Sequence, residues 1–134
     1  MDIRVSSPAD VARGVFESLF AGDYSVFDKH PGLAALREHF PPMRVAFPDF
    51  RAELKQQLVD GNRVAFQWIF RGTHDGPLLG VAPTGRTVQF QNLSISRVED
   101  GRIVQYNSEV GWLTLLGQLG VVQRLAEAAT ESAP

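Results

Sequence analysis

Residues 50–71 read FRAELKQQLVDGNRVAFQWIFR, and this stretch decides the fold. In both halves apolar side chains alternate with charged or amide ones, which is the period of a β-strand. Between the halves, Asp60-Gly61-Asn62 has the composition of a tight hairpin turn. The stretch therefore predicts an antiparallel hairpin. Its second half presents one apolar, largely aromatic face to a core, formed by Val64, Phe66, Trp68 and Phe70.

Two further strands are predicted after this hairpin. Residues 72–85 contain four glycines and two prolines, too many for a regular element, so they predict a loop. Alternation resumes over residues 87–98 and 103–110, and Glu99-Asp100-Gly101 joins these two strands by a turn. Residues 112–119 are rich in leucine and predict a short closing helix.

The residues before the hairpin predict helices. Ser7 is a good N-cap and Pro8 suits the first helical position, and apolar residues then recur at helical spacing until Gly22-Asp23. A second helical pattern covers residues 32–40, and Pro41-Pro42 stops it because proline lacks the amide hydrogen. Helices followed by hairpin-linked strands indicate an α+β fold with the helices on one side of the sheet.

The composition indicates one globular domain. The chain has 134 residues, of which 44% are hydrophobic and 21% charged, so it can bury a core. Its formal net charge of −2 provides no positive field for nucleic acid or anionic lipid, and no apolar run approaches the roughly 20 residues that cross a bilayer. There is no cysteine, and the three histidines lack metal-site spacing. We expect no metal, no cofactor, and neither a nucleic-acid nor a membrane partner.

The expected organisation is a single domain over residues 1–134. We expect an ordered core over residues 7–122 and a flexible tail over residues 123–134, because the end of the chain is small and polar. The first residues carry charges and contain no apolar stretch, which predicts that there is no signal peptide and that the protein is cytoplasmic.

Several short motifs follow one another in order: AFPDF at 46–50, DGNRVA at 60–65, GTH at 72–74, LGV at 79–81, PTGR at 83–86, SRVEDGRIV at 96–104 and QLG at 118–120. Through them, residues 47–120 resemble the SnoaL-like polyketide cyclases of the nuclear transport factor 2-like superfamily. The resemblance implies a cystatin-like fold: a curved, mostly antiparallel sheet wrapped around N-terminal helices to form a cone-shaped pocket. It also implies homodimers that form through the outer face of the sheet, where Gln57, Gln67, Gln89 and Gln105 supply polar, uncharged side chains.

Two stretches depart from the family pattern. The segment between Gly22 and Gly32 is short, whereas members usually have an additional helix and a first strand there. On the last strand, Gln105-Tyr106-Asn107-Ser108 stands where the cyclases carry a carboxylate. The acid or base of that position is therefore replaced by a hydroxyl or an amide, unless the following Glu109 takes over.

The resemblance makes Asp28 and His30 the first candidates for a catalytic base. They precede residues 32–40, the position at which steroid isomerases of the superfamily carry theirs; the competing interpretation places both in a solvated loop. Tyr106 and Ser108 share the more apolar face of the last strand, so we expect them to point into the cone. Tyr106 then serves as an oxyanion donor and Ser108 as a weaker one, unless Tyr106 only packs.

Other side chains are expected to contact a ligand. Asn92 is placed to hold a ligand carbonyl, and His74 of the GTH motif either borders the ligand or caps the loop by hydrogen bonding. Glu109 lies on the opposite strand face from Tyr106, so it becomes the best base only if the face assignment is reversed. An apolar lining is expected from the aromatic side chains Phe66, Trp68, Phe70 and Phe90.

Together these features predict a cofactor-independent cyclase or isomerase. It would act on a polyketide-like or terpenoid-like small molecule of secondary metabolism, as in antibiotic biosynthesis, with Asp28 or His30 removing a carbon-bound proton and Tyr106 stabilising the enolate. A second version folds a reactive polyene by shape alone. The alternative is a non-catalytic small-ligand-binding protein or an accessory subunit. A dehydrating or epoxide-opening lyase ranks last, because it needs paired carboxylates.

Overall fold

The computed structural model describes residues 7–121 and Glu127, so the tail expected over residues 123–134 lies outside the described residues apart from Glu127. None of the described helices has the length and apolar composition needed to cross a membrane. The elements follow one another as α1 (Pro8–Phe20), α2 (Val26–Lys29), η1 (Pro31–Leu33), α3 (Leu36–His39), α4 (Pro41–Ala46), β1 (Arg51–Asp60), β2 (Arg63–Thr73), β3 (Thr87–Glu99), β4 (Arg102–Val110) and α5 (Trp112–Gln118).

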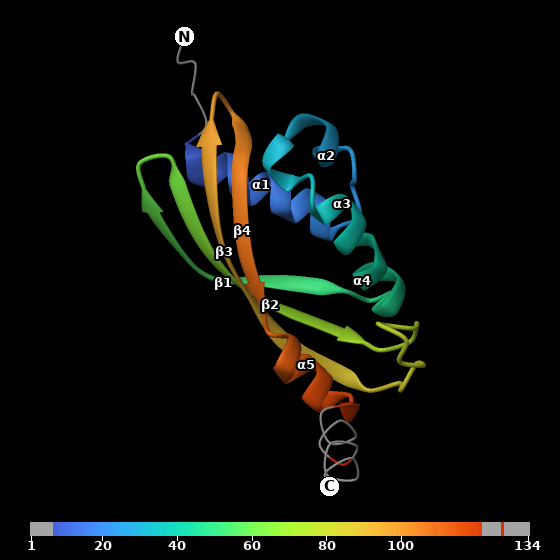
Figure 1. Ribbon diagram of the computed structural model, residues 1–134. Coiled ribbons are helices and arrows are strands. Elements are labelled where there is room, and N and C mark those ends of the chain that lie inside the picture. The colour runs from blue at the N-terminus through green and yellow to red at the C-terminus, as the bar shows by residue number, and fades with distance from the viewer. Residues whose placement is uncertain (1–6, 122–126, 128–134) are drawn as a thin grey trace, which may run out of the picture.

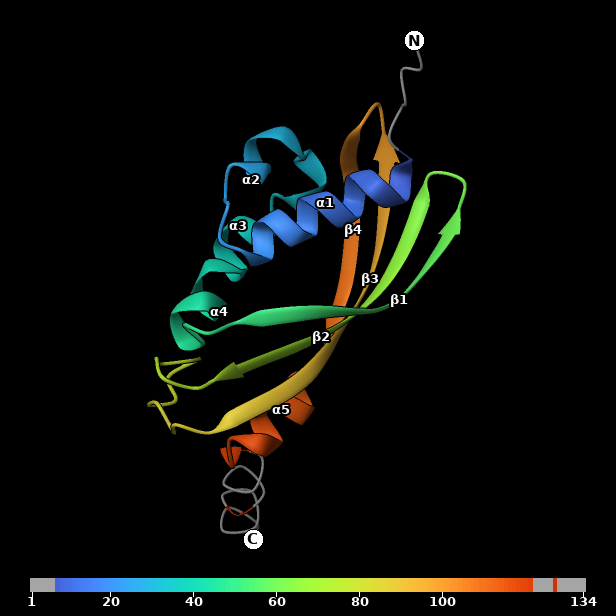
Figure 2. The ribbon, with the colours of Figure 1, turned by 180° about the vertical axis from the view of Figure 1, so that it is seen from behind.

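The strands β1 to β4 form one antiparallel sheet in sequence order. β2 pairs with β3 along its whole length, from Arg63 opposite Arg97 to Thr73 opposite Thr87. The sheet is strongly curved and twisted (Figure 1), and the view from behind shows α1 lying across its inner face (Figure 2). The predicted α+β fold, with a curved antiparallel sheet and N-terminal helices, is confirmed.

The first helix is fixed by its cap and by its apolar stripe. Ser7 Oγ accepts a hydrogen bond from the amide of Asp10 at 3.1 Å, and Pro8 occupies the first turn. Phe16 and Leu19 are almost completely buried on the side that faces the sheet. The ring of Phe16 packs edge-on against that of Phe66 in β2 at 5.9 Å. α1 therefore closes the inner face of the sheet with aromatic packing.

The segment between α1 and β1 differs from the single helix predicted over residues 32–40. It is divided into α2, η1, α3 and α4, which run beside α1 (Figure 1). α3 ends at His39, just before the two prolines as predicted, but Pro41 also begins a further helix, α4. Proline suits this position because the first residues of a helix have no intrahelical partner for their amides. Gly32 of η1 lies so close to β4 that a Cβ there would be 2.6 Å from the nitrogen of Gln105. This close approach holds the short helices over the sheet.

β2 and β3 alternate along their length between an inner, buried face and an outer face, whereas residues 55–60 of β1 are all exposed. The inner face of β2 is formed by Val64, Phe66, Trp68 and Phe70, all buried, as the sequence predicts. The inner face of β3 is apolar at its ends, with Phe90 on one side and Val98 on the other. Its centre is polar, although equally buried, and consists of Asn92, Ser94 and Ser96.

A register irregularity between Arg97 and Val98 of β3 changes which residues of β4 are buried. Ile103 is fully buried, although simple alternation places it on the same face as the exposed Glu109. A bulge inserts an extra residue into one strand and thereby reverses the parity beyond it. The inward positions of the rest of β4 are the half-buried Tyr106, Ser108 and Val110.

Candidate functional site

A cavity of about 70 Å³ lies between the helices and the inner face of the sheet. One wall is apolar and comes from α1, α3, α4 and the junction between α3 and α4, through Leu19, Phe20, Leu36, Phe40 and Met43. The other wall comes from the strands and the start of α5, with Phe70, Val110 and Trp112 as its apolar members. The polar side chains that reach the cavity are His39, Asn92, Tyr106 and Ser108. The arrangement is a mainly apolar pocket with a few converging polar groups, which is the usual form of a small-molecule site.

Tyr106 is held in the strand wall of the cavity. Its ring packs against Phe16 at a centroid distance of 5.3 Å. Burial raises the pKa of the Tyr106 phenol, and hydrogen bonding with Ser108 and Asn92 offsets part of that effect. A raised pKa keeps the phenol protonated at neutral pH. Tyr106 is therefore a hydrogen-bond donor inside an apolar pocket.

His39 lies at the mouth of the same cavity. It is the last residue of α3, its side chain is exposed overall, and it lines the cavity opposite the strand wall. Histidine is the side chain most often used as a general acid or base, because an imidazole nitrogen can accept a proton and give it back. Sequence reasoning missed His39, because one helix over residues 32–40 gives no indication of which of its polar residues face the strands.

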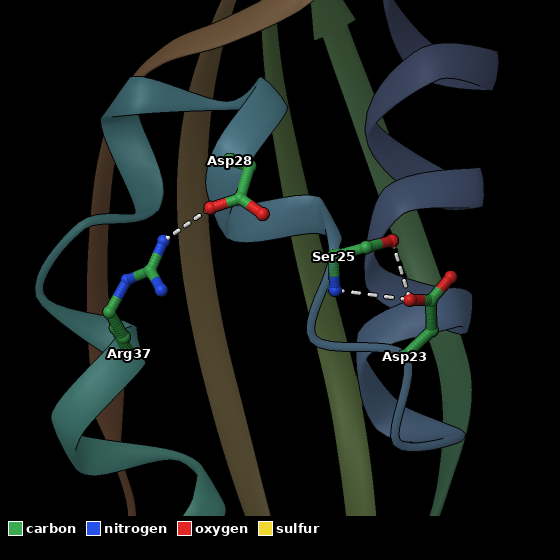
Figure 3. A network of polar contacts seen from close by, with 4 residues as sticks. All are labelled: Asp23, Ser25, Asp28 and Arg37. Atoms are coloured by element: carbon green, nitrogen blue, oxygen red, sulfur yellow. Dashed lines mark hydrogen bonds and ion pairs between the residues drawn. The ribbon is translucent and has the colours of Figure 1, made fainter.

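Asp28 lies on the surface of the short-helix segment and does not line the cavity. Its side chain is 74% exposed and forms an ion pair with Arg37 at 2.9 Å. Figure 3 shows this pair beside the turn in which Asp23 accepts hydrogen bonds from the amide and the hydroxyl of Ser25. The geometry thus corresponds to the solvated interpretation of Asp28, and an exposed ion pair of this kind contributes little to stability.

His30 is buried away from the cavity and connects two parts of the fold. Its Nδ1 accepts a hydrogen bond from the amide of Ile103 in β4 at 3.1 Å. Burial lowers the pKa of His30, and the positive charges of Lys29 and Arg102 lower it further. The neutral imidazole is therefore the form that the folded protein favours, and it ties the short-helix segment to the sheet.

This contact predicts a loss of stability in mild acid. Because the folded pKa of His30 is below its unfolded value of about 6.5, its contribution is present above that value and is lost as the pH falls through the folded pKa. His30→Asn is expected to keep an acceptor for the Ile103 amide. In urea unfolding between pH 7.5 and 5, the free energy of unfolding of this variant should depend less on pH than that of the wild type. His30→Leu should lose stability at every pH. If the free energy of unfolding of both variants depended on pH as strongly as that of the wild type, the proposed role of His30 would be contradicted.

The remaining predicted contacts divide into three groups. Phe70 and Asn92 line the cavity. His74 is fully buried at the loop after β2, where its Nδ1 accepts a hydrogen bond from the Thr84 amide at 3.2 Å, so it supports the loop. Glu109 is exposed on the outer face of the sheet. The others are buried in the aromatic core beside the cavity and do not line it: Phe66, Trp68 and Phe90.

The described part of the chain contains no cluster of potential metal ligands. Within residues 7–121, no three histidine, aspartate or glutamate side chains are grouped so that they could hold a metal ion. The site as described is therefore composed of aromatic and aliphatic walls, one phenol, one imidazole, one amide and one hydroxyl.

Comparisons with known proteins agree with this fold. The chain matches the family model described as SnoaL-like polyketide cyclase over residues 8–119, whereas no curated protein sequence matches it significantly. IdmH of Streptomyces antibioticus, assigned as a polyketide cyclase, is 29% identical, with 87% of this chain and 100% of that chain covered and a TM-score of 0.74. AclR of Streptomyces galilaeus, assigned as a hydroxylase, is 24% identical, with 84% and 95% covered and a TM-score of 0.77. Because the family model covers most of its length, this chain belongs to the SnoaL-like polyketide cyclase family.

Proposed function

We propose that the protein is a cofactor-independent cyclase or isomerase that acts on a polyketide-like or terpenoid-like small molecule of secondary metabolism. The observation that carries the proposal is that His39 and Tyr106 line one apolar cavity from opposite walls. One supplies a proton acceptor and the other a proton-bearing donor for a developing oxyanion. Membership of the cyclase family and the 29% identity to IdmH support this reading.

In the proposed mechanism, an imidazole nitrogen of His39 takes a proton from the carbon next to a substrate carbonyl. The electron pair of that C–H bond forms the enolate, and the Tyr106 O–H stabilises the negative charge on its oxygen. Asn92 and Ser108 line the same cavity as the phenol. In a cyclase, the enolate carbon then attacks a second carbonyl carbon, and the proton on His39 passes to the resulting alkoxide. In an isomerase, the proton returns at a different carbon.

The size of the cavity adds a requirement. Its volume of about 70 Å³ is well below the roughly 300 Å³ or more of pockets that enclose drug-sized ligands. A fused-ring ligand therefore needs the side chains of Leu36, Phe40 and Met43 to move outward. These residues belong to α3, to α4 and to the junction between them. The two helices are only four and six residues long, so their displacement breaks few helical hydrogen bonds.

The alternative is a non-catalytic binding protein, and one observation favours it. Among the described residues that line the cavity there is no carboxylate, the usual base in this family. The two functions are separated by hydrogen–deuterium exchange at the carbon next to the carbonyl of 1-tetralone, a bicyclic aromatic ketone, followed by NMR in D₂O. We expect the protein to accelerate this exchange. Binding of 1-tetralone without acceleration would support the binding protein.

We also propose that the protein forms a homodimer through the outer face of the sheet. Apolar side chains are exposed in the middle of this face, with Ile95 at 54% exposure. Arg63 and Arg97 lie opposite each other towards one end and Glu109 towards the other, so a two-fold axis brings unlike charges together. Glutamine side chains on neighbouring strands of the same face are linked by hydrogen bonds, from Gln56 to Gln67 and from Gln67 to Gln91.

Light scattering should therefore give the wild type twice the mass of the chain. Ile95→Arg is expected to yield monomers, because it places a third positive charge beside Arg63 and Arg97 in the contact. Leu113→Arg is the control, since Leu113 is also apolar and is even more exposed than Ile95, but lies on α5. A monomeric wild type, or an Ile95→Arg variant that remains dimeric, would contradict the proposed interface.

A further inference from the structure

The inner face of β3 carries an unusual polar stretch beneath the aromatic core. Asn92, Ser94 and Ser96 occupy three successive inward positions and are 4%, 5% and 0% exposed. Strand positions buried on the inner face of a sheet are normally filled by branched or aromatic side chains. Here three polar side chains stand between Phe90 and Val98.

Three polar atoms in this region have no hydrogen-bond partner. They are the hydroxyls of Ser94 and Ser96 and the indole nitrogen of Trp68, and all three are fully buried. Buried polar atoms in folded proteins are nearly always paired with protein, water or ligand, because an unpaired one keeps the desolvation penalty. Each of these atoms therefore requires a partner that the protein alone does not supply.

The register places these residues beside residues that line the cavity. Trp68 is paired with Asn92, and Ser94 is paired with Ser108; both Asn92 and Ser108 line the cavity. Ser96 lies one step further along the face, opposite Tyr106. The unpaired donors thus extend the polar strand wall of the cavity along the inner face of the sheet.

Packing under α1 explains the small size of the two serines but not their hydroxyls. α1 crosses the sheet here and places Phe16 against Tyr106 and Phe66, so bulky side chains on β3 would not fit. Alanine would serve this packing equally well and would leave no unpaired atom. The presence of two hydroxyls and an indole N–H, all able to donate, points to an acceptor that arrives from outside the chain.

We propose that the cavity is the outer part of a longer ligand site, whose inner end is formed by Trp68 Nε1, Ser94 Oγ and Ser96 Oγ and receives a carbonyl or hydroxyl oxygen of an aromatic ligand. This inference rests on the proposed function and adds the orientation of its ligand. The oxygenated edge of the ligand lies along β3 and β4. Its carbon-only edge lies against the apolar wall of α1, α3 and α4.

The test compares two bicyclic probes of nearly equal shape, 1-tetralone and tetralin, which differ in the carbonyl oxygen. Their affinities for the full chain are measured by NMR titration. We expect the wild type to bind 1-tetralone more tightly, and Ser94→Ala to reduce this preference about fivefold to tenfold, the usual effect of losing one hydrogen bond. Ser25→Ala is the matched control, because Ser25 is exposed and lies outside the cavity.

Urea unfolding of the same variants without ligand completes the test. An unpaired hydroxyl costs stability, so Ser94→Ala should be as stable as the wild type or more stable. A less stable variant with an unchanged probe preference would assign the hydroxyl to a structural water and overturn the proposal. So would a wild type that binds the two probes equally or binds neither. The exchange of 1-tetralone protons reports on catalysis separately, so a site that binds this ketone selectively without exchange would reject only the catalytic proposal.

Discussion

Replacing Tyr106 with phenylalanine is expected to slow the protein-catalysed proton exchange of 1-tetralone by about 100-fold, a typical loss when one oxyanion donor is removed. Phenylalanine keeps the packing against Phe16 but lacks the hydroxyl. Because burial raises the pKa of Tyr106 above its ordinary value of 10.0, the donor stays protonated through neutral pH. The rate at saturating ketone should therefore show no loss from phenol ionisation until the pH exceeds about 10.

The chain offers a matched control for this substitution. Tyr24 is the other of its two tyrosines and does not line the cavity. Tyr24→Phe should keep the wild-type exchange rate. Equal rates in the wild type and in Tyr106→Phe would contradict the oxyanion role, while equal losses in both tyrosine variants would indicate a general effect on the fold.

Replacing Gly32 with alanine is expected to destabilise the fold by about 1–3 kcal/mol, the usual cost of overpacking. A Cβ at this position would lie 2.6 Å from the nitrogen of Gln105 and 2.7 Å from the carbonyl carbon of Val104. Both are backbone atoms of β4, and they cannot turn aside as the end of a flexible side chain does. The measurement is the free energy of unfolding in urea, compared with the wild type.

Gly14 provides the opposite result in the same experiment. It lies in α1, and a Cβ there would meet nothing within 4 Å. Gly14→Ala is therefore expected to stabilise the protein by about 0.5–1 kcal/mol, because alanine loses less backbone entropy in a helix. If Gly32→Ala were as stable as the wild type, η1 would not be held against β4 by close backbone packing.

The contact between Gly32 and β4 also affects the geometry of the candidate site. η1 is followed by α3, whose last residue is His39, so the position of η1 on β4 sets where His39 meets the cavity. His30 reinforces the same attachment through its hydrogen bond to Ile103. His30, which the sequence suggests as a base, thus supports in the structure the segment that carries a different candidate base, His39.

Much of the fold follows from local sequence rules. The alternation from Phe50 to Phe70 and the turn at Gly61 predict the first hairpin, and the structure pairs Asp60 with Arg63 across it. The Ser7 cap and the Pro8 start predict α1. These elements are predicted correctly because a turn, a cap or a period-two pattern depends on neighbours within a few residues.

Rules based on local sequence fail where the same residue is compatible with two different local structures. After a helix that stops before Pro41, the chain can continue as a loop or as a new helix, and here Pro41 begins α4 directly after α3 ends at His39. The placement of Ile103 depends on an irregularity at Arg97, which nothing in the alternation of β4 itself reveals. In both cases the choice is made by packing against segments that are distant in the chain.

The sequence by itself determined the α+β class, the strands, the first helix and the aromatic inner face, because each depends on contacts between near neighbours. Only the tertiary structure decided which polar groups share the cavity. It placed Asp28 in a surface ion pair with Arg37 and brought His39 to the cavity that Tyr106 lines. The physical reason is that a site joins residues far apart in the chain, and their meeting depends on the path of the short helices and the curvature of the sheet.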